Sequence, residues 1–339
     1  MKKLIAAFLI TVILVAGAIF AALRNERHGE FNFAFFVYDK SDTFIAEMTN
    51  AIISALPENI FYETFDASNS QSIQNRQIVE AIDADFDIFI INMVDRLAAG
   101  TIVERLYREG IPIIFFNREP LEEALIGRHN VFYVGAATNI QGIRQADIAA
   151  GHFFGTGRKQ EGESVRLVIL QGEHGHQDAE IRTASSLDRL KELRLYPEIL
   201  ETRSANWRRA DARQIMSEIY ARHGDCIELI LSNNDDMALG AIDFLLEAGV
   251  FEIGMETPFI IIGVDGTPVG LRAVRDGLIF GTVLNDIPKQ TDAILALADY
   301  IIHGRQPDNF PFAMTNGHFI RIYGDIVTAD VVNAMNVEN

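Results

Sequence analysis

The sequence predicts an α/β protein made of two doubly wound lobes, each with a parallel β-sheet between layers of helices. At 339 residues the chain is longer than one hydrophobic core usually serves. Short apolar runs alternate along it with amphipathic stretches of helical length, which is the pattern of βαβ units. Because these runs are too numerous for one small sheet, we expect two sheets.

The strands are expected at short runs of apolar, β-branched and aromatic residues. The first run, 31–38, is rich in phenylalanine, and Leu167–Leu170 is wholly aliphatic, as in a strand buried on both faces. Turn-forming residues follow most of the runs and end them. In chain order the expected strands cover 31–38, 60–65, 86–91, 111–116, 131–134, 167–170, 199–207, 227–231, 259–264, 279–284 and 319–327.

The helices are expected where apolar residues recur every three or four positions. The segment 44–56 has this spacing, and Pro57 ends it. Asp178 is the expected N-cap of the helix that starts at Ala179. The expected helices cover 44–56, 72–82, 98–108, 139–153, 179 onward, 209–220, 237–248, 269–275 and 290–303.

The first 30 residues have the features of a targeting segment and are left out of the expected fold. Lys2 and Lys3 precede an uncharged apolar run, Leu4 to Leu23, with small residues suited to cleavage. The run is also long enough to span a bilayer, so an uncleaved membrane anchor remains an alternative to a signal peptide. In either case we expect the rest of the chain to be exported and to work in the periplasm or another extracytoplasmic space.

The composition excludes some classes of protein. A formal net charge of −18 argues against a nucleic-acid partner, which would require a basic face. The single cysteine, Cys226, excludes a disulfide framework within the chain. Because free cysteines are usually buried, we expect Cys226 to lie in a core.

Polar side chains recur just after the expected strands, where ligands bind in open α/β sheets. The richest stretch follows the strand 167–170 and holds His176, Asp178 and Arg182. Carboxylate, amide and guanidinium groups can each make paired hydrogen bonds, so the set suits a ligand rich in hydroxyls. The alternative is ordinary turn chemistry, for which Asn and Asp are also favoured. The other residues of the set are Asp42, Asn92, Asn234, Asp265 and Asn285.

Two aromatic residues near these loops extend the same hypothesis. Phe44 begins an expected helix, and Trp207 is the only tryptophan. A pyranose has apolar faces and a polar rim, so two aromatic plates would complement it. A core position is the alternative for Phe44. An enzyme would need a paired acid and base, a role that Asp42 and Asp178 could fill; no nucleophile with its base is evident.

Several motifs together resemble one family, the periplasmic glucose/galactose-binding proteins of sugar ABC transporters, which have the type I, ribose-binding-like fold. The resemblance covers nearly all of the chain from about Phe33. The motifs are SDTF at 41–44, IINMVD at 90–95, AAGT at 98–101, FFNREP at 115–120, GEHGHQDAE at 172–180, NNDDMA at 233–238, GVD at 263–265 and GTVLND at 281–286.

The resemblance implies a fold with three crossings between the lobes, near Ile111, Asp286–Pro288 and Arg321–Gly324. The N-terminal lobe would then comprise 31–111 and 287–321, and the C-terminal lobe 112–286 and 322–339. The family stacks its sugar between a Phe and a Trp, matched here by Phe44 and Trp207. Its polar contacts are matched by Asp42, Asn92, His176, Asp178, Arg182, Asn234, Asp265 and Asn285.

The implied function is delivery of D-glucose and D-galactose to an ABC transporter permease by a monomeric binding protein without a cofactor. The lobes would close around the sugar, and a chemoreceptor would be a further partner. A membrane-anchored sugar receptor for sensing or chemotaxis, and a sugar-processing enzyme, are the alternatives. A sugar-responsive transcription regulator shares this fold, but an apolar export segment occupies the place of its DNA-binding helices.

The chain departs from the family at the calcium loop. By alignment the family's first and last calcium ligands fall at Arg158 and Arg166, and cations there would repel Ca²⁺. We therefore expect no calcium, and expect Glu228, the family's closing ligand, to pair with one of these arginines. A transition-metal pair at His174 and His176 lacks a third ligand, so no metal site is expected.

Overall fold

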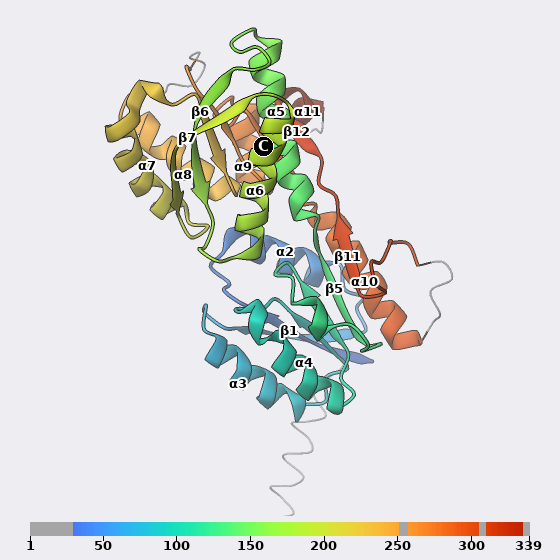
Figure 1. Cartoon of the computed structure of the whole chain (residues 1–339). Coiled ribbons are helices and arrows are strands. Elements are labelled where there is room, and N and C mark those ends of the chain that lie inside the picture. Colours follow the sequence, from blue (N-terminus) through green and yellow to red (C-terminus); the bar gives the residue numbers. More distant parts are fainter. Residues whose placement is uncertain (1–29, 251–256, 305–309, 335–339) are drawn as a thin grey trace, which may run out of the picture.

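The computed structural model describes residues 30–250, 257–304 and 310–334, and it has two lobes, each built on a six-stranded sheet (Figure 1). This confirms the predicted α/β class with two doubly wound lobes. In the first sheet, where every pairing is parallel, the order is β11–β5–β4–β3–β1–β2. Its strands are β1 (Phe31–Val37), β2 (Ile60–Asp66), β3 (Ile88–Ile91), β4 (Ile113–Phe116), β5 (Val131–Ala136) and β11 (Phe319–Ile322).

The second sheet has the equivalent order, β12–β10–β9–β8–β6–β7. Its edge strand β12 pairs antiparallel to β10, and the other pairings are parallel. Its strands are β6 (Ser164–Gln171), β7 (Tyr196–Ser204), β8 (Leu229–Ser232), β9 (Ile260–Ile262), β10 (Gly281–Val283) and β12 (Ile326–Thr328).

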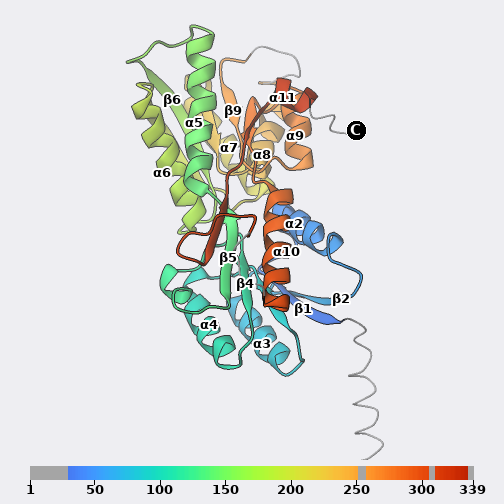
Figure 2. The ribbon, with the colours of Figure 1, turned by 90° about the vertical axis from the view of Figure 1, so that its right-hand side faces the viewer.

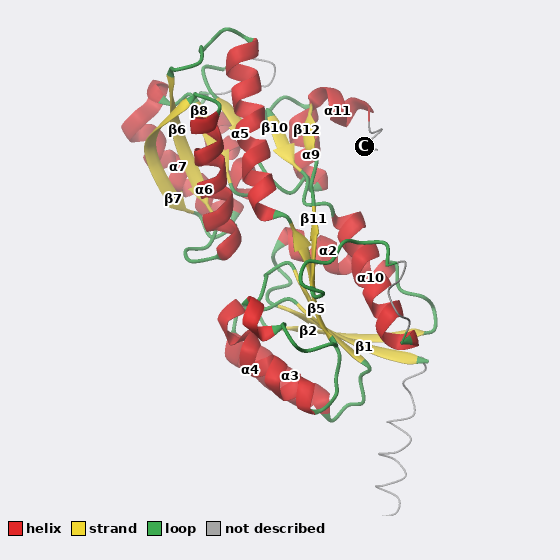
Figure 3. Ribbon diagram, turned by 45° about the vertical axis from the view of Figure 1, so that its right-hand side comes forward, coloured by secondary structure: helices red, strands yellow, loops and turns green. Residues whose placement is uncertain are grey.

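Helices cover both faces of each sheet, as parallel sheets require (Figure 3). The first lobe has α2 (Thr43–Ser54), α3 (Gln71–Ile82), α4 (Ala99–Arg108) and α10 (Ile287–His303). The second has α5 (Thr138–Gly155), α6 (Gln177–Glu192), α7 (Arg209–His223), α8 (Asp235–Glu247), α9 (Pro268–Arg275) and α11 (Ala329–Ala334). Short 3-10 turns lie at Arg96–Ala98, Glu122–Ala124 and Gly224–Cys226.

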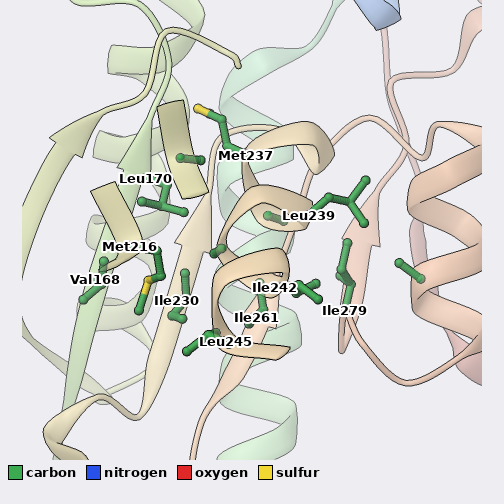
Figure 4. Packing of buried hydrophobic residues seen from close by; sticks show 14 of the residues in the cluster. Val168, Leu170, Met216, Ile230, Met237, Leu239, Ile242, Leu245, Ile261 and Ile279 are labelled. Atoms are coloured by element: carbon green, nitrogen blue, oxygen red, sulfur yellow. The ribbon is translucent and has the colours of Figure 1, made fainter. Parts of the chain in front are cut away.

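Apolar packing between sheet and helices holds each lobe together. In the second lobe, Leu170 and Ile230 of the sheet pack with Met216 of α7 and Ile242 of α8, all fully or nearly fully buried (Figure 4). Burying each such side chain contributes about 1.5–3 kcal/mol. In the first lobe the aromatic-rich β1 supplies Phe33, Phe35 and Phe36 to the core. The polar loops at the strand ends are therefore attached to tightly packed lobes.

The chain passes between the lobes three times, but the first crossing is not where we expected it (Figure 2). The expected crossing near Ile111 is wrong, because β4 and β5 belong to the first sheet. β4 pairs with β3 through Phe89 and Ile113, and β5 pairs in turn with β4. The chain crosses only after β5, and α5 packs in the second lobe. Strand pairing with distant residues, which the alternation of elements does not reveal, decides this boundary.

The other two crossings lie between β10 and α10 and between β11 and β12, near their expected positions. The tail expected as one strand over 319–327 is divided by the third crossing, at residues 323–325. The two halves therefore join different sheets.

Two smaller expectations are wrong. The N-cap of α6 is His176 rather than Asp178, and its Nδ1 accepts a hydrogen bond from the Asp178 backbone N–H at 3.1 Å. Cys226 is exposed, because it lies in a 3-10 turn and the next residue, Ile227, turns into the core instead.

The predicted export segment lies outside the described residues. Within the described ranges, we find no helix whose length and apolarity would suit a membrane span.

Candidate functional site

A cavity lies between the lobes, at the carboxyl ends of strands from both sheets. Its empty space, counting the mouth, is about 380 Å³. Its walls are Tyr38, Asp42, Phe44, Ile45, Asn117, Arg118, His176, Asp178, Arg182, Trp207, Asn234, Asp265 and Asn285.

Nine of the ten predicted site residues line this cavity, from loops far apart in sequence. Asp42 and Phe44 come from the start of α2 in the first lobe, and the other seven come from the second lobe and its crossing to α10. Parallel strands of one sheet end at the same edge, and the crossings bring the two such edges face to face.

Asn92 is the exception, because it lies beneath the cavity wall rather than in it. The residue is fully buried. Its Oδ1 accepts from the Tyr38 backbone N–H at 3.3 Å, and its Nδ2 donates to Phe116 O at 3.3 Å and to Asn117 Oδ1 at 3.1 Å. These bonds tie the loops after β1, β3 and β4 together, so in this structure Asn92 supports the wall.

Three polar wall residues were not predicted: Tyr38, Asn117 and Arg118. The Arg118 guanidinium carbon lies 3.9 Å from the centre of the Tyr38 ring. The Tyr38 hydroxyl donates to Asp42 Oδ2. Burial raises the pKa of Tyr38, and the neighbouring Asp42 charge raises it further, so the phenol remains a proton donor. Asn117 and Arg118 directly follow an expected strand, and this position could have indicated them as wall residues from the sequence.

Asp178 and Arg182 form the charged centre of the second-lobe wall. Both are nearly fully buried, and Arg182 Nη2 lies 4.0 Å from Asp178 Oδ2. Arg182 also donates to Gln141 Oε1 at 2.8 Å and to Asn233 O at 2.7 Å. Burial raises the pKa of Asp178, although the Arg182 charge opposes that rise. The arginine is therefore oriented before any ligand arrives.

The hydrogen bonding of His176 defines its tautomer. Nδ1 accepts from the backbone of α6, so the proton of the neutral ring is on Nε2. Burial, and then the charges of Arg118 and Arg182, lower the pKa of His176 well below its usual value. We therefore assign a neutral ring with its remaining nitrogen as a donor.

Trp207 is held from behind and from the side. Asn234 caps α8 through its Oδ1 and donates from Nδ2 to Trp207 O at 3.1 Å. This bond supports a left-handed backbone at Trp207, with φ 65°. The His176 ring meets the indole edge to face at 5.1 Å between centroids. A Cβ on Gly172 would come within 2.2 Å of the indole, so only glycine fits behind it.

Asp265 and Asn285 form the far end of the cavity. Asn285 Nδ2 donates to Asp265 Oδ1 at 3.3 Å, and Gln290 Nε2 donates to Asn285 Oδ1 at 2.7 Å. Burial raises the pKa of Asp265 well above its usual value. A ligand hydroxyl that donates to Asp265 would favour its ionised form.

Two hydrogen bonds join the lobes beside the cavity. Thr43 Oγ1 donates to Asp236 Oδ2 at 2.8 Å, and Arg118 Nη2 donates to Glu173 Oε2 at 2.9 Å. Between them the cavity adjoins a polar cleft whose walls include Tyr38, Asp42 and Trp207. The lobes are therefore held together at the mouth, where a ligand would enter.

The region aligned with the calcium loop is closed by cations. Glu228 pairs with Lys159 at 2.8 Å and with Arg166 at 3.2 Å, whereas Arg158 donates to Thr257 O. The predicted pairing of Glu228 with one of the two arginines is confirmed for Arg166, and Lys159 is an additional partner. Elsewhere in the part of the chain that the structure describes, no three His, Cys, Asp or Glu side chains are grouped to share a metal ion.

Asp235 is buried behind the cavity, against the loop that follows Asp265, and its ionisation predicts how the stability of the protein depends on pH. Burial raises its pKa to about 7. A pKa above the unfolded value means that the folded protein binds the proton more tightly, so stability falls as pH rises from about 4 through 7. An asparagine would avoid this penalty. We expect the melting temperature of Asp235→Asn minus that of the wild type to increase between pH 5 and pH 8, measured by differential scanning fluorimetry. A difference independent of pH would contradict the assignment.

The fold and the site define a two-lobed binding protein, with a cavity at the junction of its lobes. Residues 33–306 match the family model described as "Periplasmic binding protein domain", and the chain belongs to this family. Its members are substrate-binding proteins rather than enzymes, so the enzyme alternative is set aside.

The chain is similar to several characterised binding proteins. It is 32% identical over 244 residues to the D-galactose/methyl-galactoside binding periplasmic protein MglB of Haemophilus influenzae, covering 71% of each chain. It is 31% identical over 278 residues to the xylitol-binding protein of Mycolicibacterium smegmatis, covering 81% of this chain and 73% of that one. It is 25% identical to the ribose import binding protein RbsB of Escherichia coli, covering 71% and 74%.

Solved structures share the fold. A galactofuranose binding protein superposes with a TM-score of 0.76 at 20% identity, covering 90% of this chain and 96% of that one. A solute binding protein from Bacillus halodurans with bound myo-inositol has a TM-score of 0.74 at 24% identity, covering 91% and 98%. At these identities the likeness shows the fold alone.

Proposed function

We propose that this protein binds a hexose, D-glucose or D-galactose, outside the cytoplasmic membrane and delivers it to an ABC transporter permease. The observation that carries the proposal is the composition of the cavity wall. Phe44 from one lobe and Trp207 from the other share it with charged and amide groups from both lobes. This combination suits a small ring with apolar faces and a hydroxylated rim.

The polar wall matches hydroxyl chemistry in both directions. Asp178 and Asp265 accept hydrogen bonds, whereas Arg182 and the Nε2 of His176 donate them. Each bond to an ionised group is charge-assisted and therefore stronger than a neutral one. A hydroxyl can donate and accept at once, so a polyol satisfies the whole set better than an anion or a hydrocarbon would.

The relatives support a sugar or polyol and narrow the choice only in part. The relative that covers 71% of the chain at 32% identity is described as binding D-galactose and methyl-galactoside, but others are described as binding xylitol or ribose. Our choice of hexose rests on the residues matched to the glucose/galactose-binding family. In that family the Asp at the position of Asp42 accepts either epimer at the fourth carbon of the sugar, so the resemblance implies both hexoses.

Closure of the two lobes is the proposed mechanism. A ligand that touches Phe44 and Asp42 in one lobe and Trp207 and Arg182 in the other stabilises only the closed form. Such differential contacts are what shift an equilibrium between open and closed states. The bonds Thr43–Asp236 and Arg118–Glu173 add to the closed state. The closed monomer would then present both lobes to the permease.

Sensing is the second candidate function. If the apolar segment 4–23 is retained as an anchor, the same cavity would serve a membrane-bound receptor, and a chemoreceptor would be a partner. Sequencing the N-terminus of the mature protein distinguishes the two, because cleavage removes the anchor. The proposed sugar site is the same in both cases.

Tryptophan fluorescence tests the proposal directly, because Trp207 is the only tryptophan in the chain. We expect a saturable change with glucose or galactose at micromolar concentrations, and a much weaker response to ribose and arabinose. Isothermal titration calorimetry should give the same affinities. If neither hexose produces heat or a fluorescence change, while ribose or xylitol does, the hexose assignment is wrong and the fold serves another polyol.

A further inference from the structure

Asp235 is a fully buried carboxylate that does not line the cavity. It is the first residue of α8 and lies behind Asp265. Oδ2 accepts from the backbone N–H groups of Gly266 at 2.8 Å and Thr267 at 3.2 Å. Oδ1 accepts from Thr282 Oγ1 at 2.7 Å. Three donors from two segments converge on it, which is more than capping its own helix requires.

The peptide bond after Asp265 is clamped from both sides. Its N–H, on Gly266, donates to Asp235, and its carbonyl oxygen, on Asp265, accepts from the Asn285 backbone N–H at 2.9 Å. The backbone of Asp265 has φ 120°, a conformation that side-chain-bearing residues rarely adopt. Holding such a conformation costs about 1–3 kcal/mol, so it persists only where neighbours enforce it. Asp235 supplies one half of that enforcement.

The space around Asp235 allows little movement. A Cβ on Gly263 would lie 2.1 Å from its Oδ1, and a Cβ on Gly270 would lie 2.2 Å from its Oδ2. Both neighbours are therefore restricted to glycine while the carboxylate occupies its place. Packed this closely, the Asp235 side chain has a single position, and its hydrogen bonds hold the loop at Gly266 and Thr267 in place.

We propose that Asp235 is a positioning residue for ligand binding, which holds the strained Asp265 backbone so that the Asp265 carboxylate points into the cavity. The inference rests on the proposed function, since it requires Asp265 to contact the ligand. It makes the buried network behind the cavity, and not only the cavity wall, a determinant of affinity.

The experiment is a double-mutant cycle on the whole protein, with hexose affinity measured by calorimetry. Asp235→Ala should weaken binding about tenfold or more, since the backbone strain is no longer offset. In an Asp265→Ala background the same change should weaken binding less than about twofold, because Asp235 acts through Asp265. Asp235→Asn should bind nearly as well as the wild type, because an amide oxygen still accepts from both N–H groups while its NH₂ donates to Thr282.

Two further variants keep the test decisive. Thr282→Val removes one partner of Asp235 with less risk to folding, and should weaken binding a few-fold only when Asp265 is present. Ile242→Ala is the matched control. Ile242 is a core residue of α8, the helix that carries Asp235, so its replacement should lower stability yet leave affinity unchanged. Additive losses from Asp235→Ala and Asp265→Ala would overturn the inference, as would a wild-type affinity in Asp235→Ala. If the wild type binds no hexose, the proposed function fails, and this inference fails with it.

Discussion

Replacing Trp207 by alanine is expected to weaken hexose binding by about 30-fold or more, equivalent to roughly 2 kcal/mol. The indole forms one wall of the cavity, and its position depends on the Asn234 bond to its backbone and on the His176 ring at its edge. Without the indole, one face of the proposed sugar would be in contact with water, and the His176 ring would lose its edge-to-face contact. Calorimetry measures this loss, because the variant has no tryptophan fluorescence.

Trp207→Phe should recover most of the affinity, since a smaller aromatic plate remains. Gly172→Ala tests the same wall without altering the indole, because the added methyl group would displace the ring. We expect at least a tenfold loss. Gly151→Ala is the matched control, because nothing lies within 4 Å of a Cβ there. Equal affinities for Gly172→Ala and the wild type would place the stacking surface elsewhere.

Replacing Arg182 by alanine should weaken binding about 100-fold or more and should also destabilise the fold. The side chain is 3% exposed, and its removal leaves Asp178 as a buried charge without its ion-pair partner. Breaking a buried pair by removing one partner costs about 3–5 kcal/mol. Gln141 Oε1 and Asn233 O also lose their donor. Calorimetry and thermal unfolding measure the two losses separately.

Arg182→Lys separates charge from geometry. A lysine keeps the positive charge but not the planar fork that donates to both Gln141 and Asn233, so we expect an intermediate affinity. Arg189→Ala, on the same helix, is the control. Its pair with Asp147 is about one-third exposed, and such pairs contribute about 0–1 kcal/mol. An Arg182→Ala protein that binds hexose like the wild type would remove Arg182 from the proposed contact set.

Much of the fold and of the site could be predicted from the sequence because the signals are local. Apolar runs such as Leu167–Leu170 mark strands, since a strand buried on both faces has no polar side. The loop position of His176, Asp178 and Arg182 also follows locally, because they come directly after such a run. Strand ends in open α/β sheets collect ligands. The two-lobed fold and nine wall residues followed from this.

Long-range contacts decided the rest. The first crossing was predicted in the wrong place. β4 and β5 belong to the first sheet because β4 pairs with β3 and β5 with β4, and the residues of β4 and β5 do not by themselves reveal this pairing. Asn92 occupies a strand end like Asp42, yet its side chain is buried by bonds to the loops after β1 and β4. Nothing in the local sequence indicates that Asn92 is buried whereas Asp42 lines the cavity.

The sequence by itself therefore determined the class of fold, the order of its elements and the chemical character of the loops at the strand ends. The tertiary structure alone decided which of those loop residues face the cavity, which support it from behind, and that Tyr38 and Arg118 join the wall. The physical reason is that a side chain's direction at a strand end depends on hydrogen-bond partners from distant segments. Asp235 shows this most clearly, since its three donors come from residues 31 to 47 positions away.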